Sequence, residues 1–310
     1  MTHERLPPAT GGRRISWSSI PADVTTALER LLGSPVVAAA NQPGGFSEGL
    51  AARVRLADRR QVFVKAACTT TSPAAAAFHR REIAITAQLP SHAPVSRLLA
   101  SHDDGDWVAL VLENIPGRLP AQPWQRDELD RVLDAVTDLT RALSPSPVDP
   151  SVLGRPRLGG WLQLDPDRVR PLSPWAVGHL DDLAQLEEKA PLVLTGDTLQ
   201  HGDLYPFNLM LTADRVFVID WPHAWIGAAH CDLVTLLSSA SLSGLDPQPL
   251  AETHPLTRDL RPDQINVVLA LHAGFLLRIA ATVGPDADRN LVTMMVALAR
   301  GSLRWLRTRL

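Results

Sequence analysis

The segment HGDLYPFN occupies residues 201–208, and the run RVFVID follows it at residues 215–220. The first segment has the spacing His-x-Asp-x-x-x-x-Asn, and the second is an apolar strand pattern that ends in a carboxylate. Asp203 and Asn208 therefore share one loop, and Asp220 follows the next predicted strand. An HGD triplet or a lone aspartate after a strand is common, but this combination is far more specific.

The chemistry that uses these side chains together is phosphoryl transfer, which needs positioning and charge neutralisation more than covalent catalysis. Asp203 can orient an acceptor hydroxyl or take its proton. Asn208 and Asp220 offer the hard oxygen ligands that Mg²⁺ prefers. His201 is expected to brace the loop, and we group it with Asp203 as a catalytic candidate.

A metallohydrolase is the alternative interpretation of the same segment. It would use His201 and Asp203 as metal ligands and would need further ligands at a recognisable spacing. Only His223 and His230 are near enough in the sequence to be considered, so this alternative has little support.

The residues before this segment predict a small sheet, and those after it predict mostly helices. Strand patterns cover 36–40, 50–56, 61–66, 95–101 and 107–112, and helical patterns cover 21–32 and 74–89. Later helical patterns cover 126–143, 175–190, 231–239, 263–283 and 288–310, with strand signals at 209–211 and 215–220. We predict a polar arm (1–20), a nucleotide-binding lobe (21–112), a hinge (113–117) and a helical catalytic and acceptor-binding lobe (118–310).

Lys65 lies in the apolar strand pattern of residues 62–66, where a buried ammonium needs a partner. Only two of the 30 basic residues are lysines, Lys65 and Lys189, which hints that position 65 needs a compact charge. Glu82 follows on the next predicted helix and is the candidate partner. The alternative for Lys65 is a place on an edge strand with its ammonium group in water. The alternative for Glu82 is a solvent-facing position paired with a neighbouring arginine.

The glycine-rich stretch PGGFSEG, residues 43–49, lies between two predicted strands, about twenty residues before Lys65. Glycines allow backbone N–H groups to approach phosphates closely, and Gly45 and Ser47 are the candidate contacts. The stretch is not a Walker A motif, because no Gly-Lys-Ser/Thr follows it. By itself it would be an ordinary turn.

These motifs together resemble the aminoglycoside phosphotransferase and choline kinase family, which has a protein-kinase-like fold. The resemblance implies an α+β, two-lobed structure with a small antiparallel sheet, one crossing helix and a larger, mostly helical lobe. It implies ATP, with GTP not excluded, and Mg²⁺ as cofactors. The implied roles are catalytic base (Asp203), Mg²⁺ ligands (Asn208, Asp220), phosphate binding (Lys65 with Glu82, Gly45 and Ser47), adenine binding by the hinge (Glu113, Ile115) and bracing of the catalytic loop (Asp232).

Some residues depart from the patterns of related kinases. Asp232 also fits a plain helix N-cap. Trp221-Pro222 stands where a protein kinase has Phe-Gly, the loop has HGD instead of HRD, and we find no Ala-Pro-Glu-type segment. These differences favour a small-molecule kinase over a protein kinase.

The acceptor is expected to be a small molecule with a hydroxyl group. Carboxylates on the predicted helix 175–190 could bind an aminoglycoside-like antibiotic, although a solvated helix face is the simpler interpretation. The alternatives are a kinase of an endogenous amino alcohol, amino acid or sugar, and a catalytically silent nucleotide-binding regulator. The complete set of candidate residues argues against the regulator.

The composition of the 310-residue chain gives further limits. A formal net charge of −3 provides no positive electrostatic field that would attract nucleic acid, so no nucleic-acid partner is expected. The apolar stretch 265–283 contains His272 and Arg278, so we predict a buried core helix and no membrane partner. Two separated cysteines and the absence of an apolar leader favour the cytoplasm. The sequence does not indicate an oligomeric state.

Overall fold

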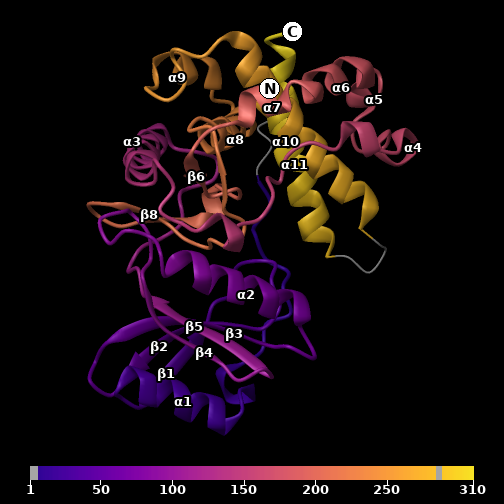
Figure 1. Ribbon diagram of the computed structural model, residues 1–310. Coiled ribbons are helices and arrows are strands. Elements are labelled where there is room, and N and C mark those ends of the chain that lie inside the picture. The colour runs from indigo at the N-terminus through magenta and orange to yellow at the C-terminus, as the bar shows by residue number, and fades with distance from the viewer. Residues whose placement is uncertain (1–5, 284–287) are drawn as a thin grey trace.

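The computed structural model describes residues 6–283 and 288–310, so the first five residues of the predicted arm lie outside the described residues. A sheet with two helices forms the lower part of Figure 1, and the remaining helices form the upper part. The described residues form one five-stranded antiparallel sheet and two short two-stranded sheets. This arrangement confirms the predicted α+β, kinase-like fold class.

The large sheet has the strand order β1-β2-β3-β5-β4. Its strands are β1 (Val36–Asn41), β2 (Leu50–Leu56), β3 (Gln61–Cys68), β4 (Leu98–Asp103) and β5 (Trp107–Glu113). Strand β3 is central, and its Lys65 pairs with Ala51 of β2 and Leu110 of β5. The position of β3 therefore places Lys65 in the middle of the sheet rather than at an edge.

Helices α1 (Ala22–Leu32) and α2 (Pro73–Thr86) lie on opposite faces of this sheet (Figure 1). In α1, Val24, Leu28 and Leu32 recur at a spacing of four residues and pack onto the sheet core. Gly33 ends α1 in the left-handed conformation, at φ 68°. On the other face, small alanines of α2 pack against β3 and β5, which lets the helix approach the strands closely.

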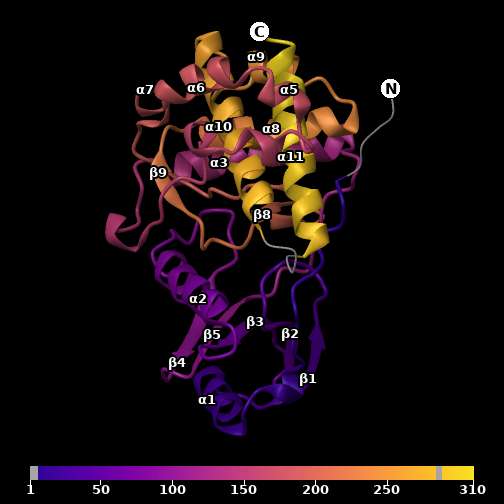
Figure 2. The same ribbon diagram turned by 90° about the vertical axis from the view of Figure 1, so that its right-hand side faces the viewer.

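Helices dominate the chain after Glu113. They are α3 (Arg126–Ala142), α4 (Pro166–Val169), α5 (Pro174–Val177), α6 (Leu180–Glu188), α7 (Ala190–Leu194), α8 (Cys231–Ala240), α9 (Pro247–Thr253), α10 (Pro262–Thr282) and α11 (Arg289–Arg307). The short strands are β6 (Thr198–Gln200), β7 (Leu209–Leu211), β8 (Val216–Val218) and β9 (Trp225–Gly227). Helices α10 and α11 pack side by side at the centre of this part (Figure 2).

Helix α10 is long and apolar enough to cross a membrane by length and composition alone. In the folded chain, 67% of its most apolar window is buried. It packs against α8 and α11, with His272 in the buried face. It is therefore a core helix, as the polar residues in the stretch predicted.

Two predicted elements are wrong in detail. The helix predicted over 175–190 is divided into α5 and α6, because the first helix ends at Gly178 and the next begins after His179. The strand predicted to begin at Val95 begins at Leu98. Val95 instead forms a bridge with Val218 of β8, so tertiary contact overrides local strand pattern there. The predicted domain boundaries stay predictions.

Candidate active site

The predicted catalytic loop, residues 201–208 and called the catalytic loop below, connects β6 to β7 and includes the short 3₁₀ turn η4 (Pro206–Asn208). The Asn208 side chain, buried in the loop, donates from Nδ2 to the Asp203 carbonyl at 2.8 Å and to Asp203 Oδ2 at 3.0 Å. This orientation leaves the Asn208 side-chain oxygen free to accept or to bind a cation. The spacing of five residues therefore brings the amide and the carboxylate into direct contact.

Gly202 and Asp232 hold this loop in place. Gly202 has a φ of 75°, and a Cβ atom there would lie 2.4 Å from the His223 carbonyl oxygen. A larger residue, such as the arginine of an HRD motif, does not fit this backbone. Asp232, at the first turn of α8, accepts hydrogen bonds from the N–H groups of His201 and Gly202.

His201 is fully buried behind the loop. Its Nε2 lies 3.0 Å from the Ile219 carbonyl oxygen, and its Nδ1 accepts from the Asp203 N–H at 3.2 Å. Both ring nitrogens are therefore occupied, which excludes the metallohydrolase role for His201. Its position supports Asp203 through the backbone, which fits the predicted bracing of the loop by His201; its role stays a prediction.

Lys65 connects the sheet to the end of β8. Its Nζ lies 2.8 Å from both carboxylate oxygens of Glu82 and 2.6 Å from Asp220 Oδ1. The Glu82 side chain is only 2% exposed, whereas that of Asp220 is 44% exposed. Glu82 thus anchors the lysine from behind, and Asp220 faces the open side.

The electrostatics of this cluster favour the charged forms of Lys65 and Asp220, whereas burial raises the pKa of Glu82. Burial alone would lower the pKa of Lys65, but the carboxylates of Asp220 and Glu82 outweigh burial and raise it. Burial alone would raise the pKa of Asp220, but the Lys65 cation lowers it to about 2. Asp220 also has a φ of 72°, a strained backbone for a residue with a side chain. Such strain is common where a side chain must be aimed at a ligand.

The glycine-rich loop lies over the catalytic loop. Phe46 at its tip packs edge-on against Phe207, with ring centroids 6.5 Å apart. Gly45 has a φ of 89°, and a Cβ there would lie 2.6 Å from the Arg14 guanidinium. The Ser47 hydroxyl lies 3.3 Å from Arg14 Nη1. The predicted residues Gly45 and Ser47 are therefore placed beside an arginine of the N-terminal arm.

Arg157 is a further residue of the site, and sequence reasoning missed it. Its Nη1 donates to Asp203 Oδ1 at 2.8 Å, and its guanidinium lies over the Phe275 ring. Burial, and then the Arg157 charge, lower the pKa of His223 to about 4, so this neighbouring imidazole is neutral at neutral pH. Arg157 ends a Pro-rich loop 46 positions before Asp203, and no local pattern marks it.

A model of the phosphotransferase enzyme family matches residues 44–261, which is more than half of the chain. The chain belongs to this family. An aminoglycoside 3'-phosphotransferase from Streptomyces ribosidificus is 30% identical over 156 residues. The match covers 45% of this chain and 56% of that enzyme, so the chain spans about half the length of this curated relative.

Solved structures share the fold of this chain. A thermostable mutant of an aminoglycoside phosphotransferase, crystallised with AMP-PNP and hygromycin B, aligns with a TM-score of 0.55 over 92% of this chain and 99% of its own. A choline/ethanolamine kinase family protein from Mesorhizobium loti also gives 0.55, over 92% and 94%. Both are 14% identical to this chain, so they show the fold alone.

The oxygen donors of Asn208 and Asp220 fit a magnesium ion that takes further ligands from a bound nucleotide. Within residues 6–283 and 288–310, no group of three or more His, Cys, Asp or Glu side chains converges on one point. The backbone N–H of Ile219 donates to the Asn208 carbonyl, which holds Asn208 next to Asp220. Mg²⁺ commonly binds one or two protein oxygens and takes its other ligands from phosphates and water.

The predicted hinge, residues 113–117, follows β5. The Glu113 N–H donates to the Arg97 carbonyl, and the Glu113 carbonyl accepts from Ser96 Oγ at 2.8 Å. Its carbonyl keeps a second lone pair for a ligand, whereas its N–H is already used. Ile115 has a buried side chain and accepts from the Gly117 N–H. Adenine binding by Glu113 and Ile115 stays a prediction.

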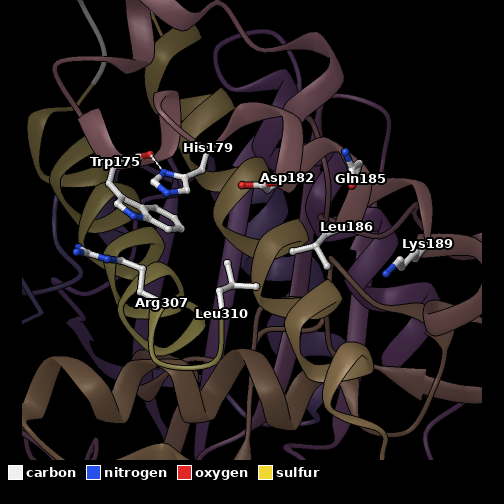
Figure 3. A pocket seen from close by; sticks show the side chains of 8 residues that line it. All are labelled: Trp175, His179, Asp182, Gln185, Leu186, Lys189, Arg307 and Leu310. Atoms are coloured by element: carbon white, nitrogen blue, oxygen red, sulfur yellow. Dashed lines mark hydrogen bonds between the residues drawn. The ribbon is translucent and has the colours of Figure 1, made fainter.

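A cavity of about 660 Å³ lies elsewhere, between α5, α6 and the end of α11 (Figure 3). Trp175, His179 and Arg307 stack at one side of it, and Asp182 and Lys189 lie further along. None of its lining residues belongs to the catalytic loop, the glycine-rich loop or the lysine cluster. We therefore assign the chemistry to the polar cluster rather than to this cavity.

Proposed function

We propose that this protein transfers the γ-phosphoryl group of ATP, with Mg²⁺, to a hydroxyl group of a small molecule. The observation that carries the proposal is the meeting of Lys65, from the sheet, with Asp220, from the helical part, at 2.6 Å. An ammonium and a metal-binding carboxylate at one point fit a triphosphate with its magnesium ion. The complete set of Lys65, Glu82, Asp203, Asn208 and Asp220 supports catalysis over a silent nucleotide-binding role.

Each residue has a role in this proposal. Lys65, held by Glu82, neutralises the nucleotide phosphates. Asp220 and the free Asn208 oxygen hold the magnesium ion, which would neutralise charge on the phosphates when bound. Asp203 orients the acceptor hydroxyl and accepts its proton. Asp232 keeps the catalytic loop fixed.

Arg157 gives Asp203 a partner beside the acceptor. Each carboxylate oxygen can accept more than one hydrogen bond, so an acceptor hydroxyl can donate to Asp203 while Arg157 stays in place. The Asp203 side chain is 18% exposed, so it can be reached from solvent.

The first candidate acceptor is an aminoglycoside-like antibiotic, which would make the enzyme a resistance factor. The similarity to an aminoglycoside 3'-phosphotransferase supports this choice. Acidic side chains are present on α6, but Glu187 already accepts hydrogen bonds from the N–H groups of Gly160 and Trp161. Asp181, Asp182 and Glu188 remain exposed for a polycation.

The second candidate is an endogenous metabolite such as an amino acid or a sugar. The observation that favours it is the guanidinium of Arg157 at the catalytic carboxylate, since a cation there repels a polycationic acceptor. A neutral or acidic hydroxyl compound would meet no such repulsion.

The proposed function is tested by ADP release from Mg·ATP in the presence of aminoglycosides, macrolides, and small metabolic alcohols, hydroxy acids and sugars. Acceptor-dependent ADP release supports the proposal, and the active compound identifies the acceptor class. Tight Mg·ATP binding with no transfer to any acceptor would indicate the nucleotide-binding regulator. The free cysteines Cys68 and Cys231 fit the cytoplasm as the compartment of this activity.

A further inference from the structure

The N-terminal arm crosses from the helical part to the glycine-rich loop. Leu6 is buried in the core of the helical part, and the Thr10 carbonyl accepts from Asn290 Nδ2 at 3.1 Å. Thr10 then forms bridges with Gly44 and Gly45, and Arg14 forms one with Gly49. Residues 10–15 therefore lie along the glycine-rich loop as an additional extended segment.

The close packing of the arm is built into its sequence. A Cβ on Gly12 would lie 2.2 Å from the Ser47 carbonyl oxygen, and a Cβ on Gly11 would overlap the Asp288 carboxylate. The Gly12 N–H also donates to the Gly45 carbonyl. Only glycine permits this approach, so the arm lies on the loop by specific backbone contact.

The contact delivers the side chain of Arg14 to the inner side of the loop. Its Nη2 donates to the Gly44 carbonyl at 2.6 Å, and its Nη1 donates to Ser47 Oγ at 3.3 Å. A guanidinium has five N–H donors, so these bonds leave three for another partner. Arg14 Nε is buried and has no hydrogen-bond partner among the described residues. Such an orphaned donor is costly in a folded protein and indicates an absent acceptor.

The charged neighbours of Arg14 locate it at the nucleotide site. Burial lowers the pKa of Arg14, and the negative charge of Asp220 acts in the opposite direction. Burial, followed by the charge of Lys65, lowers the pKa of His79 to about 3, and both Asp220 and Arg14 also act on that imidazole. His79 Nε2 is likewise buried without a described partner. Arg14 therefore shares one electrostatic environment with Lys65 and Asp220.

We propose that Arg14 binds the phosphates of the nucleotide directly, as a second cation opposite Lys65. The inference rests on the proposed function, because it assumes that a nucleoside triphosphate occupies the space under the glycine-rich loop. A triphosphate supplies acceptor oxygens for the free guanidinium donors, in a geometry that arginine matches well. Arg14 lies outside the segment matched by the family model, which begins at residue 44. The arm thus adds a phosphate-binding residue to the site.

The test is titration calorimetry with adenosine, ADP and ATP in Mg²⁺ buffer, on the full chain and on Arg14→Ala. Arg13→Ala is the matched control, because the Arg13 side chain is 85% exposed and pairs with Glu48. We expect Arg14→Ala to weaken ATP binding by about 10- to 100-fold, ADP binding less, and adenosine binding by under about twofold. Arg13→Ala is expected to stay within about twofold for all three ligands.

Other outcomes overturn the inference. Unchanged or tighter ATP binding by Arg14→Ala would mean that the arm only covers the site, and an equal loss for adenosine and ATP would mean a general structural role. If Arg14→Ala does not fold, Arg14→Gln decides. It keeps much of the side-chain length without the positive charge, and an ATP affinity within about twofold of the parent would contradict direct phosphate contact. Failure of the proposed function is distinct, since the unchanged protein would then bind no Mg·ATP, or would bind it without phosphoryl transfer to any acceptor.

Discussion

The ammonium of Lys65 lies 2.6 Å from the carboxylate of Asp220, although 155 positions separate the two residues. One belongs to the central strand of the sheet and the other follows β8 in the helical part. Because Lys65 also contacts Glu82 on α2, the cluster ties three elements together. The two parts of the molecule therefore meet at the residues to which we assign nucleotide and metal binding.

Asp220→Asn tests the metal side of this cluster. The substitution keeps the size of the side chain but removes the charge that Mg²⁺ and Lys65 both require. We expect nucleotide affinity to become nearly independent of Mg²⁺, with at least about a tenfold loss of Mg·ATP affinity. Calorimetry with and without Mg²⁺ measures the effect. Asp214→Asn, in the exposed turn before β8, is the control, and an unchanged metal dependence in Asp220→Asn would remove Asp220 from the metal site.

Asp203→Asn tests the catalytic assignment. The amide can still contact Arg157 or Asn208 but cannot take a proton from the acceptor. We expect the rate of transfer to fall by about 10²- to 10⁴-fold, with Mg·ATP affinity within about threefold of the parent. Coupled ADP-release kinetics and calorimetry give the two quantities. Loss of nucleotide binding in a folded Asp203→Asn protein would contradict the assigned role.

The spacing of short motifs predicted the parts of the site that are local. Asn208 contacts Asp203 because five residues form one loop, and Lys65 contacts Glu82 because a strand leads directly into the helix behind it. The contact of Asp232 with the loop backbone agrees with the bracing position that the family resemblance implied. The catalytic and binding roles of all these residues remain predictions until they are measured.

Residues supplied by irregular segments could not be predicted. Arg157 reaches Asp203 from a Pro-rich loop, and Arg14 reaches Ser47 from an arm without a recognisable motif. Their placement depends on how distant segments pack, which residue periodicity does not encode. The same limit explains the helix break at Gly178. The apolar pattern continues past this residue, but the helical backbone of α5 ends there.

Asp232→Ala tests how much the contact of this carboxylate with the loop contributes to stability. The alternative of a plain helix N-cap is wrong, because the N-cap of α8 is His230 and no side chain caps that helix. Burial raises its pKa, yet it accepts hydrogen bonds from two part-buried backbone N–H groups, those of His201 and Gly202. Leaving these donors unsatisfied should cost about 1–3 kcal/mol each. Urea unfolding measures the loss. Asp246→Ala removes a plain N-cap from α9 and should cost about 1 kcal/mol. Equal losses in both variants would mean that the loop contact of Asp232 contributes no more stability than an ordinary cap.

Arg157→Ala tests the partner of the catalytic carboxylate. Without the guanidinium, Asp203 loses the hydrogen bond that fixes one of its oxygens, so we expect transfer to slow by about tenfold or more while Mg·ATP affinity stays within about twofold. Initial rates over a range of acceptor concentrations, together with calorimetry, measure both effects. The exposed neighbour Arg155 gives the control variant Arg155→Ala. Faster transfer by Arg157→Ala would show that the ion pair obstructs the acceptor instead.

His272 makes the stability of the helical part depend on pH. The ring is buried under the catalytic loop, with Nε2 at 2.7 Å from the Tyr205 hydroxyl and Nδ1 at 2.7 Å from Ser302 Oγ. Burial lowers the pKa of His272 from 6.5 to about 3. Between these values the unfolded chain binds a proton that the folded protein does not. The stability that His272 provides is therefore complete above about pH 6.5 and is lost as pH falls, by about 1.4 kcal/mol per pH unit.

His272→Gln removes this titration, and Ser302→Ala removes only a hydrogen bond to the same ring. Both variants should be less stable than the parent near pH 7.5. On acidification to about pH 5, the deficit of His272→Gln should shrink by about 2 kcal/mol, whereas that of Ser302→Ala should stay nearly constant. Urea unfolding at several pH values measures both deficits. A His272→Gln curve parallel to the parent would mean that the ring becomes protonated within the fold. The Tyr205 contact would then be an ionic hydrogen bond, and the catalytic loop itself would sense pH.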